Sequence, residues 1–383
     1  MRTVGIICEY NPLHRGHEKQ LRQVRQLGAE AVVCLMSGNY VQRGAPAILD
    51  KMLRARAALE CGADLVLELP ITAALSSAEG FAREGVRLLG SFCEELCFGA
   101  ETADRTSLMS TAEALLSADF SPALRQQLDL GFSFPVARAK ALESLRLDAS
   151  LLNTPNNILG VEYCKAMLSL GCAMKPLVIH RPGDYHDLEA DPENPSATAI
   201  RQRMLCSEDW ASLVPEGVRR LFEGATQHSL AYGEGAILAR LRTMTEAEFE
   251  ALPYGSEGLW RKLMHASGEC ARLEDVAAAV KSKRYTRTRI DRMILCAFLG
   301  LTLDDMNTPA PYTRVLGLTD RGRTALRKAK ESGVFYNVGE KTGDGYQNLE
   351  NRCADLYALF AQTRPEPAGA EGKLRLLYRA SDN

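Results

Sequence analysis

Two histidines near the start of the chain are spaced to act together on a phosphate group. His14 and His17 flank Gly16 and follow residues 3–8, an apolar run of strand length. Pro12 interrupts that pattern because proline has no amide donor for a sheet. After His17 the apolar residues recur every three positions, which indicates a helix. Both imidazoles are therefore expected where a strand passes into the first turn of a helix.

That position favours an anion, because the first turn of a helix presents free backbone N–H groups and the positive end of the helix dipole. Gly16 would let the backbone approach a nucleotide closely. The pattern His-x-Gly-His resembles the signature of the nucleotidyltransferase superfamily, in which the imidazoles hold ATP phosphates while AMP is transferred. The alternative is that two surface histidines only cap a helix.

Length and composition narrow the class of protein. A chain of 383 residues is expected to form two domains. No apolar run reaches membrane-spanning length, and the eleven scattered cysteines form no Cys-x-x-Cys pair. We therefore expect a cytosolic protein with reduced thiols, no metal site and no membrane contact. With a net charge of −2, binding to nucleic acid would need a local basic surface.

Apolar runs of strand length alternate with helical patterns in the first half of the chain. Continuous apolar strands in such an alternation predict an α/β fold with a doubly wound parallel sheet, of the nucleotidyltransferase-like Rossmann type. The expected strands are residues 3–8, 31–36, 64–69, 95–98 and 175–180, and the expected helices include one from Pro46 and one over residues 79–89.

The domain organisation follows from where these patterns change. A helical insertion is expected over about residues 104–150, before the last strand. Strand-like runs become few after Cys206, so we expect a nucleotide-binding domain over residues 1–204 and a mainly α-helical domain over residues 205–383. A fragment ending near Met204 would then still bind ATP if the helical domain is not needed for folding.

Four loops follow the expected strands, over residues 10–17, 37–44, 99–101 and 181–187. Ligands of open parallel sheets bind outside the carboxyl ends of the strands, so these loops are the expected site. In the second loop, Asn39 and Arg43 could hold a carboxylate or a phosphate.

Charged residues on the helix after that loop allow two interpretations. Asp50, Lys51 and Arg54 share one side of the expected helix. They could face the ligand, or they could form a solvated helix start with a local ion pair.

The loop after the last strand also allows two interpretations. It carries Arg181 and His186, and Asp184 and Asp187 could orient an imidazole or bind a metal. A plain turn is the alternative for the two carboxylates.

A second anion clamp is possible where the next helix starts. Ser196 and Thr198 bring hydroxyls to that start, and Arg201 follows one turn later. These residues could face the histidines, or Ser196 could be an ordinary N-cap.

Taken together, the motifs resemble one family closely, the bacterial tRNA(Met) cytidine acetate ligases. The resemblance runs through the N-terminal half and continues more weakly after residue 280. The matching segments are residues 9–17 (EYNPLHRGH), 36–44 (MSGNYVQRG), 46–48 (PAI), 50–51 (DK), 62–70 (GADLVLELP), 98–99 (FG), 155–163 (PNNILGVEY), 185–187 (YHD), 282–285 (SKRY) and 312–317 (YTRVLG).

The resemblance implies an activity. The family activates acetate with ATP to acetyl-adenylate, releasing pyrophosphate, and then transfers the acetyl group to N4 of the wobble cytidine of elongator tRNA(Met). Residues 1–204 would activate ATP and acetate, and residues 205–383 would bind the tRNA. Mg²⁺ is expected with the triphosphate, held mostly by phosphate oxygens and water.

The resemblance also implies where each substrate binds. His14, His17 and Arg181 would be catalytic. The acetate or adenylate pocket would comprise Ser37, Gly38, Asn39, Gln42, Arg43, Asp50 and Lys51. ATP would contact Ile7, Glu9, Tyr10, Asn11, Pro12, His14, Gly16, His17, Gln20, Gly99, Asn156 or Asn157, Arg181, Ser196, Thr198 and Arg201. Many superfamily members have a further hydroxyl where this chain has Ala197, which weakens the expected second clamp.

Basic residues cluster in a short segment of the C-terminal half, as RNA binding would need. Arginine, lysine and an aromatic ring together suit RNA backbone and an unstacked base. The alternative is a solvated helix face, and residues 314–330 form a second basic stretch with the same ambiguity. The candidate tRNA contacts are Lys281, Lys283, Arg284, Tyr285, Arg287 and Arg289, with Arg292 nearby.

Two other functions compete with the ligase. A small-molecule adenylyltransferase of cofactor biosynthesis would explain the N-terminal half but would leave the basic helical half without a role. A non-catalytic, nucleotide-sensing RNA-binding protein would not need His14, His17 and Arg181 together. Acetate-dependent release of pyrophosphate from ATP separates the ligase from both.

Overall fold

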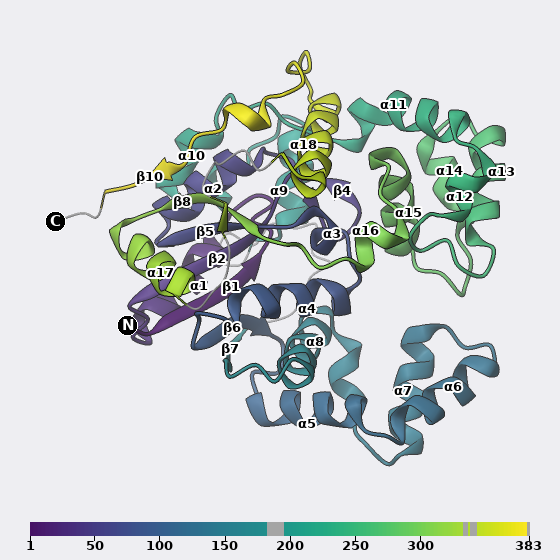
Figure 1. Ribbon diagram of the computed structural model, residues 1–383, viewed down its shortest axis with the longest axis horizontal. Coiled ribbons are helices and arrows are strands. Elements are labelled where there is room, and N and C mark those ends of the chain that lie inside the picture. Colours follow the sequence, from purple (N-terminus) through teal and green to yellow (C-terminus); the bar gives the residue numbers. More distant parts are fainter. Residues whose placement is uncertain (182–194, 332–335, 338–342, 381–383) are drawn as a thin grey trace.

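The computed structural model describes residues 1–181, 195–331, 336–337 and 343–380, and a mostly parallel sheet with helices on both faces forms its centre (Figure 1). Five parallel strands make up the middle of this sheet in the order β5-β2-β1-β6-β7. They are β1 (Thr3–Cys8), β2 (Ala31–Ser37), β5 (Leu65–Leu69), β6 (Glu95–Ala100) and β7 (Lys175–His180). The strand order reverses between β1 and β6, so the predicted doubly wound sheet is confirmed.

Alternate residues of the central strands pack into two separate hydrophobic cores, one on each face of the sheet. Along β2, Val33 and Leu35 pack with α4 (Ala78–Leu89) and α8 (Pro155–Ser169). The intervening Val32 and Cys34 pack with α1 (Arg15–Gln26), α2 (Lys51–Glu60) and α9 (Ala197–Leu205) on the other face. Strands buried on both faces explain why each was a continuous apolar run.

The helix expected from Pro46 begins later, at Lys51. Pro46 instead lies in β4 (Ala45–Pro46), which pairs with β3 (Tyr40–Val41) to form a short hairpin. Asp50 caps α2, because its carboxylate accepts hydrogen bonds from the backbone N–H groups of Met52 and Leu53 at 2.8 and 3.0 Å. An aspartate that satisfies two free amides fixes the helix start more strongly than a proline can.

Two helical parts extend from the sheet (Figure 1). The predicted insertion consists of α5 (Arg105–Leu116), α6 (Phe120–Asp129), α7 (Phe134–Ser144) and the short η1 (Ser150–Asn153). The second part has a core of its own and consists of α11 (Leu230–Thr243), α12 (Glu246–Glu250), α13 (Leu259–Glu269), α14 (Leu273–Val280) and α15 (Arg287–Leu299). We call residues 230–299 the helical lobe. Short elements η2 (Ala211–Leu213), α10 (Glu216–Phe222) and α16 (Leu303–Asn307) flank it.

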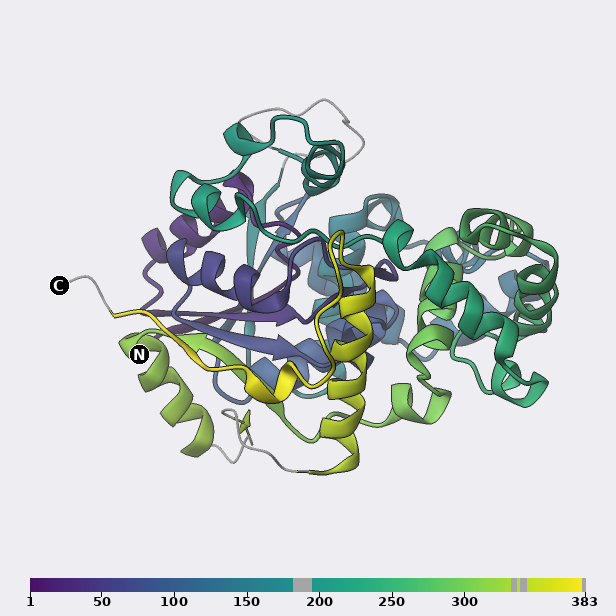
Figure 2. The ribbon, with the colours of Figure 1, turned by 90° about the horizontal axis from the view of Figure 1, so that it is seen from above.

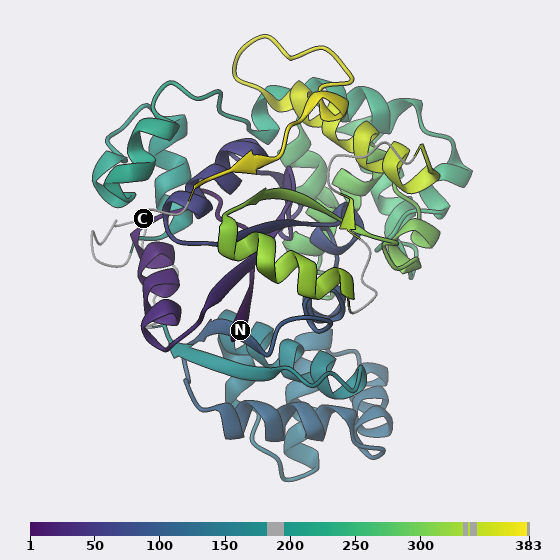
Figure 3. The same cartoon turned by 60° about the vertical axis from the view of Figure 1, so that its left-hand side comes forward.

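The chain then returns to the sheet, which differs from the expected division at residue 204. Strand β8 (Thr313–Leu318) pairs antiparallel with β5, β10 (Leu377–Tyr378) pairs with β8, and β9 (Tyr336–Asn337) pairs with β8 off the main path. Figure 3 shows β10 and β8 side by side at this edge, with α17 (Asp320–Glu331) against the sheet. β8 was not predicted, because its sequence leads into the basic stretch of residues 314–330 and lies in a half of the chain that is mostly helical.

The C-terminal elements and the helical lobe also hold the β3–β4 hairpin. α18 (Gly345–Tyr357) runs past the carboxyl ends of the central strands (Figure 2). It leads into η3 (Ala358–Phe360), and η4 (Glu371–Lys373) follows. Tyr40 of β3 is buried in the core of the helical lobe, beside α3 (Ile71–Ala74). Its hydroxyl donates to the Cys353 carbonyl at 2.9 Å, and its ring lies edge-on to Tyr357 and Phe360.

This interlocking predicts that residues 1–204 will not fold alone. A chain ending at Met204 lacks β8, which leaves the edge of β5 unpaired, and exposes Tyr40, Ile71 and Leu75, which the helical lobe covers. We expect this fragment to aggregate or to lack a cooperative unfolding transition by circular dichroism, whereas the full chain unfolds cooperatively. A monomeric fragment that unfolds cooperatively and binds ATP would contradict this prediction.

Candidate active site

His14 and His17 cap the first turn of α1 with their own side chains. The Nδ1 atom of His14 accepts from the Gly16 N–H at 3.1 Å, and the Nδ1 atom of His17 accepts from the His14 N–H at 3.3 Å. The two rings stack with centroids 3.8 Å apart, and Tyr10 packs edge-on against His17 at 5.0 Å. The histidines therefore do cap the helix, as the alternative interpretation stated, but His14 is buried and is not a surface residue.

Capping fixes which nitrogen of each ring carries the proton. A neutral imidazole whose Nδ1 atom accepts a hydrogen bond must carry its proton on Nε2. Both rings therefore present Nε2–H donors. His14 is 2% exposed, and its Nε2 atom has no hydrogen-bond partner among the described residues. A buried donor without a partner is costly unless a ligand satisfies it.

Both imidazoles are neutral at physiological pH. The pKa of His14 is lowered from 6.5 to about 3, mainly by burial and in addition by the positive charges of Arg181 and Arg201. Burial also lowers the pKa of His17 well below its usual value, followed by the effects of His14 and Arg181. Two arginines near neutral imidazoles form a site that attracts anions without protonating the histidines.

The expected ATP residues beside the histidines lie at the ends of β1, β6 and β7. Gly99 lies against Arg181, since a Cβ atom at this glycine would be 3.2 Å from the Arg181 Cβ atom. Gln20 lies one turn along α1 and its amide approaches the Cys97 sulfur at 3.8 Å. Ile7 is half-buried on β1, while Tyr10 and Pro12 are buried in the loop that follows.

Arg201 connects the start of α9 to this loop. Its guanidinium donates to the Asn11 carbonyl at 2.7 Å and to the Thr198 hydroxyl at 3.0 Å. The side chain of Ser196 caps α9 by accepting from Ala199 N–H at 3.5 Å, which matches its plainer interpretation. The expected second clamp is thus reduced to Arg201 and the exposed Thr198 beside it.

The loop after β2 contributes further polar groups without partners. The Ser37 hydroxyl is fully buried, and it and the Gln42 side-chain nitrogen have no hydrogen-bond partner among the described residues. The Gln42 backbone N–H donates to Glu9 Oε1 at 2.8 Å, which ties this loop to the end of β1. Arg43 is exposed on the same loop.

Asn39, Asp50 and Lys51 support this loop. The Asn39 side-chain oxygen accepts from the Lys51 N–H at 3.0 Å, and the Asp50 carboxylate caps α2. The Lys51 ammonium is buried and donates to both carboxylate oxygens of Glu68, at 2.7 and 3.0 Å, and to Glu371. Gly38 leaves room for Glu68, because a Cβ atom there would collide with that carboxylate.

A buried charge cluster surrounds Lys51. It includes Glu68, Glu371 and Arg314, which pairs with Glu371, and Glu350 borders the same small cavity. The pKa of Glu350 is raised to about 7, mainly by burial and in addition by the negative charge of Glu68. Lys51 was expected to contact the substrate, whereas in this structure its ammonium contacts the carboxylates of Glu68 and Glu371.

Asn156 and Asn157 stand at the start of α8 and have different partners. Asn157 is buried. Its Oδ1 atom accepts from the Thr102 backbone N–H at 3.0 Å, and its Nδ2 atom donates to the Thr102 hydroxyl at 3.3 Å. Asn156 is half-buried, and its Nδ2 atom donates to Glu101 at 2.7 Å. Glu101, which lies in the expected loop 99–101 but was not named as a site residue, also accepts from both asparagine backbone N–H groups. Asn156 is thus the more accessible of the two.

Sequence reasoning also missed the role of Arg54, a fully buried cation. Its guanidinium donates to the carbonyls of Glu9 at 2.6 Å, Ser37 at 3.1 Å and Leu49 at 2.9 Å, and also to that of Gly38. One side chain thereby joins the loops after β1 and β2 to the start of α2. The only signal in the sequence was its place on the same helix side as Asp50 and Lys51.

The candidate tRNA segment leads into α15, with several of its cations already paired. Arg287 pairs with Glu274 at 2.5 Å and Asp291 at 2.7 Å, and Arg284 pairs with Glu257 at 2.8 Å. The guanidinium of Arg289 donates to the Tyr254 carbonyl at 2.9 Å and covers the largely buried ring of Tyr285 at 4.9 Å. Lys281 and Lys283 are exposed.

Some expectations cannot be compared with the structure. His186, Asp184 and Asp187 lie outside the described residues. Within the described ranges, no group of three or more histidine, cysteine, aspartate or glutamate side chains could hold a metal ion. No helix in those ranges is both long and apolar enough to cross a membrane.

The neutral state of His14 predicts a specific pH dependence. Because its pKa is about 3 in the folded state and near 6.5 when unfolded, the unfolded chain binds more protons between these values. The free energy of unfolding should therefore fall as pH decreases below 6.5, by up to about 1.4 kcal/mol per pH unit for this group. His14→Asn, which keeps an N-cap acceptor, should have a shallower pH dependence in urea titrations from pH 7 to 4.5. Parallel curves for the two proteins would contradict the assignment.

Comparison with known proteins identifies the family of this chain. Residues 1–371 match the family model described as HIGH Nucleotidyl Transferase. The tRNA(Met) cytidine acetate ligase of Clostridium novyi is 37% identical over 382 residues, covering 94% of this chain and 96% of that protein. The enzyme of the same name from Clostridium acetobutylicum is 36% identical over 357 residues, covering 87% and 88%.

Two solved structures are similar over essentially the whole chain. The apo form I crystal structure of Thermotoga maritima TmcAL has a TM-score of 0.92 and 27% sequence identity, with complete coverage of both chains. The form II structure of TmcAL bound with alpha-thio ATP has a TM-score of 0.88 and 28% identity, covering 99% and 100%. With relatives above 30% identity along most of its length and this shared fold, the chain belongs to the tRNA(Met) cytidine acetate ligase family of HIGH nucleotidyltransferases.

Proposed function

We propose that this protein joins acetate to the α-phosphate of ATP and then transfers the acetyl group to N4 of the wobble cytidine of elongator tRNA(Met). The pair of Nε2–H donors at the start of α1 carries this proposal. Their neutral state, their position at a strand end and the arginines beside them suit a triphosphate. The names of the relatives support the choice of acetate and tRNA(Met) as the other two substrates.

In the first step, a carboxylate oxygen of acetate attacks the α-phosphorus and pyrophosphate leaves. Negative charge grows on the leaving pyrophosphate, so donors that are already oriented toward it lower the barrier. His14 and His17 supply two such donors, and Arg181 and Arg201 supply positive charge, as their effect on the pKa of His14 indicates. The free N–H groups in the first turn of α1 add to this environment.

For acetate, we propose the loop after β2 as the pocket. The unpartnered Ser37 hydroxyl and Gln42 side-chain nitrogen could donate to its carboxylate, and the exposed Arg43 could complement its charge. Gly38 and Asn39 shape the loop. Asp50 and Lys51 support it from behind through the α2 cap and the buried charge cluster.

In the second step, the N4 amine of cytidine attacks the acetyl carbonyl, the bond between the acyl carbon and the phosphate oxygen breaks, and AMP leaves. We propose that Lys281, Lys283, Arg284, Tyr285, Arg287 and Arg289 form the tRNA-binding segment. The exposed Lys281, Lys283 and Arg284 would contact phosphates directly, whereas the less exposed Arg287 and Arg289 would shape the surface. Mg²⁺ would enter with ATP, and the reaction would take place in the cytoplasm, where tRNA is processed.

A small-molecule adenylyltransferase is not favoured. The relatives that match along most of the chain are named as tRNA(Met) cytidine acetate ligases, and the match continues through the helical lobe. An enzyme acting on a small cofactor precursor would have no evident use for that lobe.

Exchange of labelled pyrophosphate into ATP tests the first step without tRNA. We expect exchange that depends on acetate, and a loss of about ten- to a thousandfold in kcat/KM for His14→Ala or His17→Ala, the range for removing one oriented donor. Arg22→Ala, an exposed change on the same helix, is the matched control and should retain activity. Exchange without acetate, or full activity in both histidine variants, would contradict the proposal.

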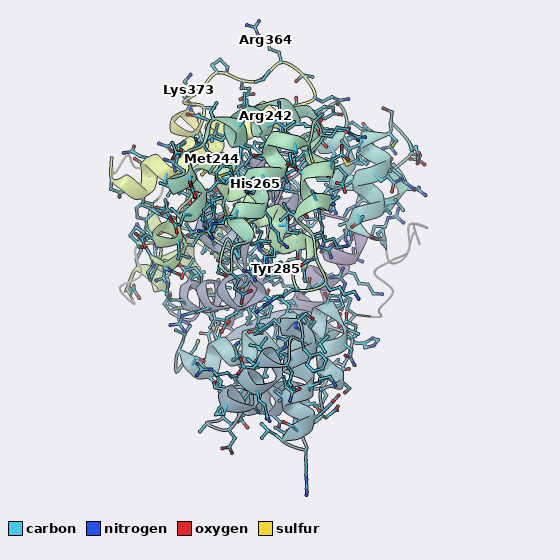
Figure 4. All side chains as sticks on the ribbon, turned by 90° about the vertical axis from the view of Figure 1, so that its right-hand side faces the viewer. Arg242, Met244, His265, Tyr285, Arg364 and Lys373 are labelled. Atoms are coloured by element: carbon cyan, nitrogen blue, oxygen red, sulfur yellow. The ribbon has the colours of Figure 1, made fainter. Side chains whose placement is uncertain are left out.

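The tRNA segment is tested separately by changing its least constrained cations. Combining Lys281→Gln, Lys283→Gln and Arg284→Gln should weaken tRNA binding and reduce the slope of log affinity against log salt by about 2 to 3, because fewer counterions are released. Pyrophosphate exchange should be unchanged. Arg364→Gln with Lys373→Gln is the control, since Figure 4 places these residues far from Tyr285 on the same face. An unchanged salt slope in the triple variant would show that the segment is a solvated surface.

A further inference from the structure

The β3–β4 hairpin is the place where the helical lobe reaches the candidate site. The hairpin directly follows Ser37 and Asn39 and carries Gln42 at its turn. Its Gly44 lies against the second turn of α15, because a Cβ atom there would be 2.5 Å from the backbone nitrogen of Arg292. With a φ of 81°, Gly44 is also in a conformation that favours glycine. The hairpin is therefore fitted closely to α15.

Arg292 fastens this contact with its side chain. Its Nη1 atom donates to the Gln42 carbonyl at 3.2 Å, and its guanidinium lies 5.0 Å from the ring centre of Tyr254. The Tyr254 hydroxyl donates to the Leu75 carbonyl at 2.7 Å, beside α3. The arginine is thus held on an aromatic ring that is itself anchored to the nucleotide-binding part of the chain.

The residue that Arg292 holds also organises the site. The Gln42 backbone N–H donates to Glu9 at 2.8 Å, and Glu9 stands at the end of β1, in the loop that leads to His14. The side-chain nitrogen of Gln42 is one of the unpartnered donors proposed for acetate. Arg292 therefore fixes both a proposed substrate donor and its connection to the ATP loop.

α15 also carries part of the candidate tRNA segment. Its first turn, Arg287 to Arg289, belongs to the candidate tRNA segment, and Arg292 lies about one turn further along the same helix. A rigid helix thus joins that segment directly to the hairpin.

We propose that Arg292 is a positioning residue by which the helical lobe completes the ATP and acetate site, acting through Gln42. The part of this role that concerns ATP and acetate rests on the proposed function. The site is then shared between the two halves of the chain, although Arg292 itself touches no substrate.

Two variants and a control test this role. Arg292→Met removes the hydrogen bond and the charge, and Arg292→Lys keeps the charge but loses the planar fork. Arg261→Met is the control, because Arg261 also stacks on an aromatic ring of the lobe, Trp260 at 4.7 Å, but is exposed. Hydrogen exchange of the Gln42 amide, thermal unfolding, and KM and kcat of acetate-dependent pyrophosphate exchange are measured for each.

We expect Arg292→Met to speed exchange of the Gln42 amide and to raise KM for acetate about tenfold, the effect of losing one hydrogen bond of about 1.4 kcal/mol, with a smaller change in kcat. Arg292→Lys should recover part of both effects, and Arg261→Met should show neither. Unchanged Gln42 exchange and KM in Arg292→Met, or the same changes in Arg261→Met, would overturn the role of Arg292. Absence of acetate-dependent exchange in the wild type would instead reject the proposed function, while the hydrogen-exchange comparison would still decide whether Arg292 positions Gln42.

Discussion

The chemistry proposed for the candidate site depends first on how the backbone of α1 fixes two imidazoles. The Nδ1 atoms of His14 and His17 are used in capping the helix, so the protons must lie on the opposite nitrogens. Burial and two nearby arginines keep the rings uncharged. The same contacts that start the helix thus produce a pair of oriented, neutral donors. Capping the helix and presenting donors to a ligand are therefore compatible roles of the same two side chains.

The loops that would hold the substrates are fixed in a similar way, by cations that bond to backbone oxygens. Arg54 joins the loops after β1 and β2 from inside, and Arg292 holds the Gln42 carbonyl from the helical lobe. These contacts hold the backbone of the loops in place, while the Ser37 hydroxyl and the Gln42 side-chain nitrogen have no partner among the described residues.

Sequence reasoning predicted the parts that depend on local pattern. The central strands were predictable as continuous apolar runs, and the histidines were placed correctly because a strand, a proline and a helical period surround them. It could not predict contacts between residues far apart in the chain. Lys51 was expected to contact a substrate, but in the structure it contacts Glu371. That partner lies 320 residues away in the sequence, so the pairing could not be foreseen. β8 was missed because it lies in the C-terminal half, where no regular alternation of strands and helices surrounds it, and its antiparallel partner β5 is far away in the sequence.

The central claim is that both histidines are neutral Nε2–H donors to ATP, and ¹⁵N NMR of the imidazole rings measures this directly. His14→Asn and His17→Asn identify the two pairs of signals among the six histidines of the chain. We predict that both rings are neutral with protonated Nε2 atoms at pH 7, and that ATP shifts both Nε2 signals while each Nδ1 atom remains unprotonated. Cationic rings, protons on Nδ1, or Nε2 signals that do not respond to ATP would contradict this account of the site.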